Sequence, residues 1–106
     1  MTKNFQMLFL LTTIIGTLNA ADHLVDQKGK TFIPHTLIVK VGDTITFRNS
    51  DPFAHNAYTD DEVNEFDIGM QAAGTDTTIT IKGKGEGHFN VECAIHPNML
   101  VEVTVK

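Results

Sequence analysis

Three side chains that bind soft metal ions lie close together near the end of this sequence. Cys93, His96 and Met99 follow the spacing Cys-x-x-His-x-x-Met, which places a thiolate, an imidazole and a thioether within seven residues. These donors are soft or borderline, so they suit copper better than magnesium or calcium. A trigonal set of two imidazoles and one thiolate needs a second histidine. We expect His55 to supply it, because it lies shortly after the turn predicted at residues 49–52.

A site of this composition favours redox chemistry. Cu(II) and Cu(I) prefer different geometries, so a fold that imposes a compromise geometry lets an electron move with little rearrangement. A weak thioether ligand such as Met99 then helps to set the reduction potential. Each residue also has a structural alternative, since a lone cysteine or methionine often simply fills a core. The shared register of Cys93, His96 and Met99 favours the metal site.

The segments that must position these residues have the pattern of short β-strands. Ile45 and Phe47 alternate with polar neighbours, and Val101 and Val103 do the same near the end of the chain. We expect strands at residues 36–41, 44–48, 77–82, 88–93 and 100–105, with shorter ones near 24–25 and 55–58. About six to eight short strands separated by Gly, Asp and Pro turns predict an all-β Greek-key sandwich. Residues 59–76 have irregular apolar spacing, and we expect a loop with one helical turn there.

The N-terminal segment has the features of a secretory signal. Lys3 gives a short basic start, residues 7–18 are mostly apolar, and small residues at 19–21 offer a cleavage site. The apolar stretch of 12 residues is too short to cross a bilayer of about 30 Å as a helix, so we expect no stable membrane insertion. We therefore predict a signal peptide at residues 1–20 and one exported domain at residues 21–106.

The composition limits the partners of this domain and its means of stabilisation. The chain has 13 acidic and 8 basic side chains, a formal charge of −5, which becomes −6 (7 basic against 13 acidic) once Lys3 is removed. No cluster of Lys or Arg is present in the sequence, which argues against nucleic acid. Because a single cysteine cannot form an internal disulfide, Cys93 indicates a metal, a reactive thiol or an intermolecular bridge. A group of acidic side chains fits either a solvated loop or a docking surface for a basic partner: Asp60, Asp61, Glu62, Glu65 and Asp67.

The order of these motifs along the chain resembles the cupredoxins, and most closely their amicyanin and plastocyanin branch. The resemblance spans nearly all of residues 21–106, and the short spacing from Cys93 to Met99, with Pro97 after the histidine, is similar to amicyanin rather than to plastocyanin. The matching segments are Phe32-x-Pro34-x-x-Leu37-x-Val39, Gly42-Asp43-Thr-Ile45-x-Phe47-x-Asn49-x-Asp51, His55-Asn56, Phe66-Asp-x-Gly69 and Gly87-x-Phe89-x-Val91-x-Cys93.

This resemblance implies a cupredoxin fold that holds one type 1 copper ion. The implied ligands are His55, Cys93 and His96, with Met99 as the weaker axial ligand. His96 would lie near the surface in an apolar patch and serve as the exit for the electron. Two further groups would hold the geometry: Asn56, by hydrogen bonds between the ligand loops, and Pro97, by stiffening its own loop.

The resemblance also implies a function. We expect a soluble, monomeric one-electron carrier in the periplasm, not an enzyme, which passes electrons from a donor dehydrogenase to an acceptor such as a c-type cytochrome. The alternative is a copper-delivery protein without redox shuttling. Such a protein would usually carry a Met- or His-rich tract, and only Met70 and Met99 follow the signal segment. A copper enzyme would need a second centre, commonly with His-x-His pairs, and the sequence has none.

The remaining residues of interest fall outside this pattern. Glu92 stands before the cysteine, where the family often has an aromatic residue or histidine, and we expect its side chain to point outward. His35 and His88 are expected at the surface. Cleavage after Ala20 would leave Ala21-Asp22-His23 at the N-terminus, where an amine, two amides and an imidazole can surround Cu(II) in a square plane.

Overall fold

A computed structural model describes residues 19–106, so nearly all of the predicted signal peptide lies outside the described residues. This part of the chain forms nine strands and no helix, which confirms the all-β prediction. Accordingly, no helix long and apolar enough to cross a membrane occurs among residues 19–106. The strands are β1 (Asp22–Lys28), β2 (Thr31–Ile33), β3 (Thr36–Val39), β4 (Thr44–Asn49), β5 (Tyr58–Thr59), β6 (Phe66–Asp67), β7 (Asp76–Thr80), β8 (Gly87–Cys93) and β9 (His96–Val105).

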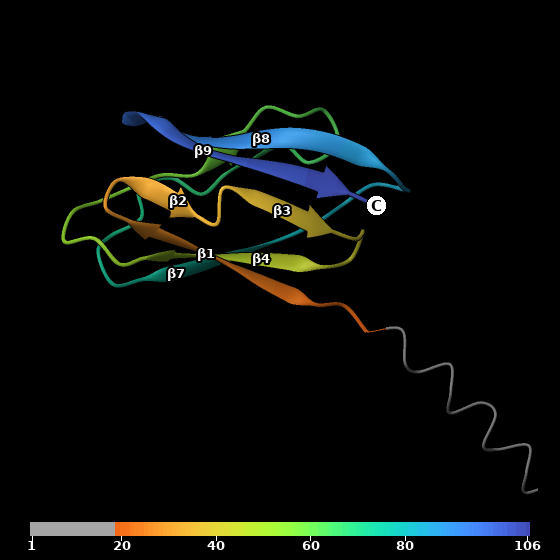
Figure 1. Ribbon diagram of the computed structural model, residues 1–106, viewed down its shortest axis with the longest axis horizontal. Coiled ribbons are helices and arrows are strands. Elements are labelled where there is room, and N and C mark those ends of the chain that lie inside the picture. The colour runs from red at the N-terminus through yellow and green to blue at the C-terminus, as the bar shows by residue number, and fades with distance from the viewer. Residues whose placement is uncertain (1–18) are drawn as a thin grey trace, which may run out of the picture.

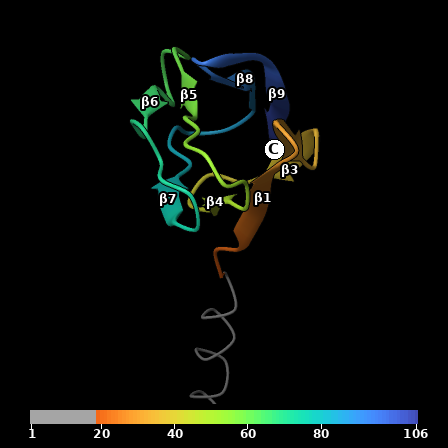
Figure 2. The same cartoon turned by 90° about the vertical axis from the view of Figure 1, so that its left-hand side faces the viewer.

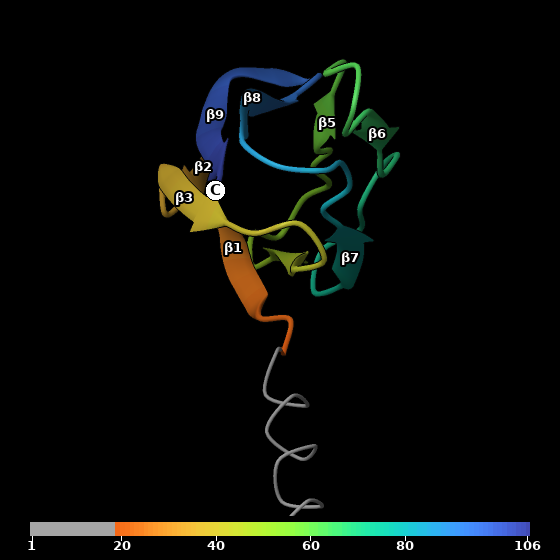
Figure 3. The ribbon, with the colours of Figure 1, turned by 90° about the vertical axis from the view of Figure 1, so that its right-hand side faces the viewer.

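The strands form two sheets that face each other (Figure 1). One sheet has the order β2-β1-β4-β7, and the other has the order β3-β9-β8-β5-β6. The pairs β1–β4 and β3–β9 are parallel, and the other pairs are antiparallel. Figure 2 looks along the strands from the end where β1 finishes and β9 begins, and Figure 3 looks from the opposite end. In both views the layers enclose one interior.

Alternation along the strands fills this interior with apolar side chains, as predicted. Val101, Val103 and Val105 are buried on β9, while the residues between them face outward. The opposite sheet contributes Phe32 from β2 and Phe47 from β4, whose rings pack edge to face with centroids 6.1 Å apart. The same alternation on β8 buries Cys93, so the strand pattern that builds the core also turns this sulfur inward.

The structure corrects several predicted boundaries. Residues 59–76 contain the short strand β6 and turns rather than a helical turn. His55 forms an isolated bridge with Gln71 and does not begin a strand, which starts only at Tyr58. Strand β9 begins at His96, four residues before the predicted start at Leu100. The hairpin of β1 and β2 was not predicted, because its inward position at Gln27 carries a polar side chain that breaks the apolar alternation.

A buried carboxylate fastens the start of β1 to the sheet. Asp43, in the turn between β3 and β4, accepts hydrogen bonds from the backbone nitrogens of Ala21 and Lys40, at 3.0 and 2.9 Å. Its second oxygen lies 2.9 Å from His23 Nε2. The hydrogen bond from Ala21, followed by the one from His23, lowers the pKa of Asp43 from 3.8 to about 2.

Replacing Asp43 by asparagine keeps the shape of the side chain and removes its charge. We expect Asp43→Asn to lower the free energy of unfolding by about 1–3 kcal/mol at neutral pH, because a donor loses its acceptor. Since the folded pKa of about 2 lies below the unfolded value of 3.8, the contribution is present above pH 3.8 and is lost as pH falls through the folded value. Urea unfolding over a pH series measures this difference. Parallel stability curves for the variant and the wild type would contradict it.

Candidate metal centre

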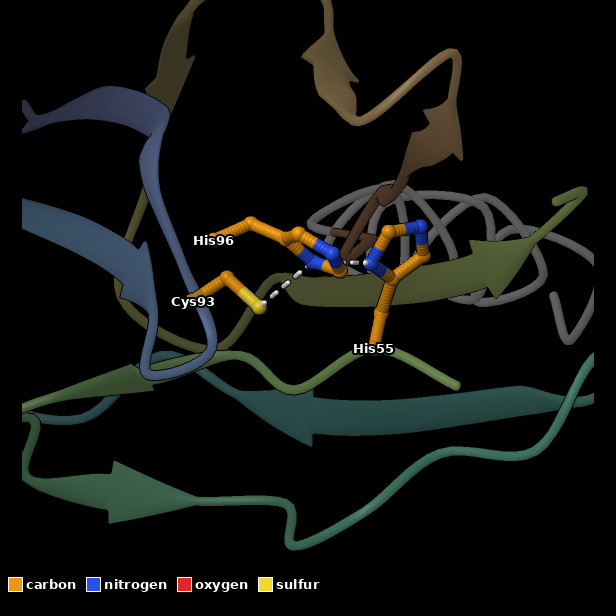
Figure 4. A group of neighbouring side chains, drawn as sticks. All are labelled: His55, Cys93 and His96. Carbon is orange, nitrogen blue, oxygen red and sulfur yellow. Dashed lines mark hydrogen bonds between the residues drawn. The ribbon is translucent and has the colours of Figure 1, made fainter. Parts of the chain in front are cut away.

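Three donor atoms converge at the end of the sandwich where β8 finishes and β9 begins (Figure 4). Cys93 is the last residue of β8, His96 is the first residue of β9, and His55 comes from the segment between β4 and β5. His55 Nδ1 lies 3.1 Å from His96 Nδ1, and Cys93 Sγ lies 3.7 Å from the same His96 nitrogen. The donor atoms of the three residues all lie within 4.8 Å of one another.

These separations fit a metal ion held in a plane. Bonds of about 2.0–2.3 Å, as zinc makes to imidazole and thiolate, place three trigonal donors roughly 3.5 Å apart. The two measured separations, 3.1 and 3.7 Å, lie on either side of that value. A set of one thiolate and two imidazoles is the trigonal set that suits copper. His55 and Cys93 are buried, so their donor atoms are withdrawn from competing water.

A wide irregularity in the β8–β9 ladder shapes this turn. Cys93 pairs with His96, but the preceding residue, Glu92, pairs with Leu100. Residues 97–99 of β9 therefore have no partner on β8. Pro97 is the first of the three, and its lack of an N–H leaves no donor unpaired at the interruption. Met99 is the last of them, and its side chain is fully buried in the core. Met99 thus continues the inward alternation of Val101, and the interruption places His96 instead of Met99 opposite Cys93.

His55 is held from its backbone and from the far side of its ring. Its backbone N–H donates to the carbonyl of Gln71 at 3.0 Å, and its own carbonyl accepts the N–H of Gln71 at 2.7 Å. Its Nε2 lies 2.7 Å from the carboxylate of Asp51. Burial raises the pKa of Asp51, but hydrogen bonds from Lys30, His55 and Gly29 outweigh burial and leave that pKa below its ordinary value.

Asn56 joins the two segments that carry the donors, as the resemblance implied. Its side-chain oxygen accepts the backbone N–H of Ala94 at 3.0 Å, in the turn between Cys93 and His96. Its Nδ2 donates to Asp67 Oδ1 at 2.8 Å and to the carbonyl of Gly69 at 3.1 Å. Because Asn56 follows His55 in the chain, these contacts fix the spacing between His55 and the β8–β9 turn.

The cluster reaches the surface through His96, which is only half-buried. Two exposed apolar side chains flank it, Phe53 and Ile95. The Phe53 ring lies 5.9 Å from the His96 ring and 5.3 Å from the His55 ring, between centroids. The apolar surroundings expected for His96 are therefore present. Glu92 is exposed on the outer face of the sheet, as predicted.

The other histidines lie apart from this cluster. His35 and His88 are exposed, as predicted. The imidazole of His23 and the backbone nitrogen of Ala21 both contact Asp43. A square-planar Cu(II) site across residues 21–23 would have to break both contacts, so the geometry does not favour it. Within the acidic group, the Asp61 carboxylate accepts hydrogen bonds from the backbone N–H groups of Val63 and Asn64. Asp61 therefore has a structural role in this turn.

Sequence reasoning assigned no role to three residues that surround the cluster. Gln71 lies in the segment expected to be a loop, and only the fold brings it beside His55. Phe53 and Asp51 belong to the stretch Asn49-Ser-Asp-Pro-Phe, where an aspartate is an ordinary turn residue. Asp51 lies four residues before His55 and within the segment that resembles the family, but neither signal distinguishes it from a turn former.

Comparison with known proteins agrees with this geometry. The family described as copper binding proteins, plastocyanin/azurin family, matches residues 20–106. The methylamine utilization protein MauL of Methylophilus methylotrophus is 31% identical over 87 residues, which cover 77% of this chain and 50% of MauL. The chain thus spans about half the length of that relative.

The chain also superposes on solved structures of copper proteins. A copper-containing nitrite reductase (NirK) from Thermus scotoductus SA-01 superposes with a TM-score of 0.72 and 27% identity, over 80% of this chain and 22% of the reductase. A Cu(I) structure of an amicyanin mutant superposes with a TM-score of 0.69 and 26% identity, over 80% of this chain and 82% of amicyanin.

A two-sheet β-sandwich with a buried thiolate and two imidazoles at one end defines a cupredoxin. This chain belongs to the plastocyanin/azurin family of copper binding proteins, in which it is amicyanin-like, and copper is its cofactor.

Truncating Asn56 tests the link between the donor-bearing segments. We expect Asn56→Ala to lower the free energy of unfolding by about 1–3 kcal/mol and the affinity for copper about tenfold, because the Ala94 N–H loses its acceptor. Urea unfolding of the metal-free protein and competition with a copper chelator measure the two effects.

Asn64 provides a matched control at another place in the fold. It is also a buried asparagine that joins two segments, through hydrogen bonds of 3.2 and 2.7 Å with the backbone of Lys82. Asn64→Ala should destabilise the protein without changing its copper affinity. Equal copper affinities for both variants would refute the specific role of Asn56.

Proposed function

We propose that this protein is a one-electron carrier that holds a single type 1 copper ion with His55, Cys93, His96 and, more weakly, Met99. The observation that carries the proposal is the convergence of one buried thiolate and two imidazoles, only one of which reaches the surface. A single site of this kind can exchange an electron with a partner at His96 while the other donors stay out of water.

The fold supplies the rigidity that such exchange requires. Bound copper would contribute the Cu(I)/Cu(II) couple, and the chain would keep the donors nearly fixed in both states. Cys93 and His96 are joined by the β8–β9 ladder, and His55 is held by Gln71 and Asp51. Met99 lies in the packed core, where its thioether has little freedom to move. These contacts support a small rearrangement on electron transfer.

We further propose that the partners are redox proteins that dock around His96. Phe53 and Ile95 provide an exposed apolar surface beside its ring. The relative MauL is named for methylamine utilization, and we propose a dehydrogenase as the donor and a c-type cytochrome as the acceptor. We also propose that the protein is a monomer and not itself an enzyme; among the described residues, a single group of histidine and cysteine side chains could hold a metal ion.

The same proposal places the carrier in the periplasm after removal of residues 1–20. The nitrogen of Ala21 lies 3.0 Å from the Asp43 carboxylate, so an α-ammonium created there would gain an ion pair. Expression of the full chain in a bacterium should therefore yield a periplasmic protein of residues 21–106, which mass spectrometry identifies. Recovery of the full-length chain from the cytoplasmic fraction alone would contradict export.

The visible spectrum tests the copper site directly. Addition of one equivalent of Cu(II) to the metal-free domain should give an intense blue thiolate-to-copper band. This band should be absent from Cys93→Ser and retained in Met99→Leu, which keeps the volume of the core but alters the reduction potential. A colourless wild-type protein, or a band that survives Cys93→Ser, would rule out the proposed ligands.

A reduction cycle separates electron transfer from copper delivery. The carrier should bleach with a reductant, keep its copper in the presence of a Cu(I) chelator, and recover its colour on oxidation. Loss of the reduced metal to the chelator would favour the copper-delivery alternative.

A further inference from the structure

The Asp51 carboxylate receives three hydrogen bonds in the loop that leads to His55. Its Oδ1 accepts the backbone N–H of Gly29 at 2.7 Å, and its Oδ2 accepts that of Lys30 at 3.0 Å. The same Oδ2 lies 2.7 Å from His55 Nε2. Asp51 is only 8% exposed, so water does little to replace these partners. A carboxylate at this position therefore couples the β1–β2 turn to one of the proposed copper ligands.

This contact decides which nitrogen of His55 carries the proton. A carboxylate only accepts hydrogen bonds, so the short contact with Asp51 requires a proton on His55 Nε2. The Nδ1 lone pair then faces Cys93 and His96. The 3.1 Å contact between the two Nδ1 atoms is consistent with this, with His55 as acceptor and His96 as donor. The ring is thus oriented for a metal before any metal binds.

The turn between β1 and β2 is shaped to hold the carboxylate. Gly29 and Lys30 both have left-handed backbone angles, with φ of 64° and 59°. Two successive residues of this kind form the type I′ turn of a tight hairpin. The conformation is uncommon for a residue such as Lys30, and here it points two neighbouring N–H groups at Asp51. Adjacent amides of this kind form a concave site for an anion.

We propose that Asp51 is a positioning residue of the copper centre, which with the β1–β2 turn fixes the Nε2–H form of His55 and lowers the reduction potential. The inference rests on the proposed electron-carrier function. A carboxylate bonded to the outer nitrogen makes the imidazole a stronger donor. A nearby negative charge also stabilises Cu(II) more than Cu(I), because Cu(II) carries the larger charge.

An asparagine cannot reproduce this arrangement, because it offers one acceptor oxygen to three donors. With its oxygen at the Oδ1 position it satisfies Gly29, but its NH₂ group faces Lys30 and donates to His55 Nε2. The proton of His55 then moves to Nδ1, where it blocks the metal. With its oxygen at the Oδ2 position, its NH₂ group faces the N–H of Gly29. Both groups are donors, so the Gly29 N–H then has no acceptor.

Asp43 gives a matched control within the same protein. It too is buried and accepts two backbone N–H groups and the Nε2 of a histidine, His23. His23 does not belong to the candidate metal centre. The two carboxylates lie at opposite ends of β4, whose six residues span roughly 20 Å. Asp43→Asn therefore matches the loss of stability but leaves the copper site alone.

The experiment compares Asp51→Asn, Asp43→Asn and the wild type in two measurements. First, ¹⁵N NMR of the metal-free protein in alkaline buffer should show His55 in the Nε2–H form in the wild type and in Asp43→Asn. Asp51→Asn should show an increased Nδ1–H fraction. Second, chelator competition should show a loss of Cu(II) affinity of about 10- to 100-fold in Asp51→Asn only. The loss of Cu(I) affinity should be about tenfold smaller, which raises the reduction potential by about 59 mV.

Each result bears on the proposal. An Nδ1–H form in the wild type overturns it, even if Asp51→Asn fails to fold. An unchanged ratio of Cu(II) to Cu(I) affinity in a folded Asp51→Asn, or the same change in Asp43→Asn, also overturns it. Asp51→Glu, which retains the charge, should keep the potential close to the wild-type value. If the wild type lacks the blue band, the electron-carrier function fails, whereas the NMR of the metal-free protein still decides the role of Asp51.

Discussion

The antiparallel pairing of β8 with β9 is the contact on which the rest of this molecule depends. The inward side chains of the two strands, such as Val91 and Val103, lie at the centre of the core. The end of the same pair carries Cys93 and His96. Because β9 also pairs with β3, the strand that starts at the candidate metal centre is held along both edges. Core packing and donor placement are thus consequences of a single ladder.

A second constraint brings His55 to that ladder. It arrives from the segment after β4, in the opposite sheet, and the connection is built from buried polar groups. Asn49 donates to the carbonyls of Phe53 and Gln71, and the Gln71 side chain donates to the carbonyl of Phe47. Buried polar groups need such partners, so each bond also limits the positions the loop can adopt. The result is a donor on a loop that is positioned almost as firmly as one on a strand.

The sequence predicts the parts of this structure that depend on local pattern. Alternation identifies the inward faces of β4, β8 and β9, and the spacing from Cys93 to His96 identifies a soft-metal site before any fold is known. The second histidine follows from the need for another imidazole and from the resemblance to cupredoxins. The structure brings these three residues together, while the axial role of Met99 stays a prediction.

What the sequence does not predict depends on contacts between distant segments. Gln27 occupies a core position on β1 because it donates to Gln71, 44 residues away, and no local rule places a glutamine there. The pairing of Asp51 with the Gly29–Lys30 turn has the same origin. The two-residue strand β6 forms because Tyr58 and Thr59 of β5 pair with it. Two residues are too few to show an alternation of apolar and polar side chains. Tertiary context decides each of these features.

The buried carboxylates of Asp43 and Asp51 also bear on chemical durability. Small domains often rely on disulfides, but the cysteine of this chain is free and lies at the candidate metal centre. The cross-links between distant segments are made instead by carboxylates and backbone amides, at both ends of β4. Reducing agents have no disulfide to cleave here. A protein built this way can accept and donate electrons without exposing its own fold to reduction.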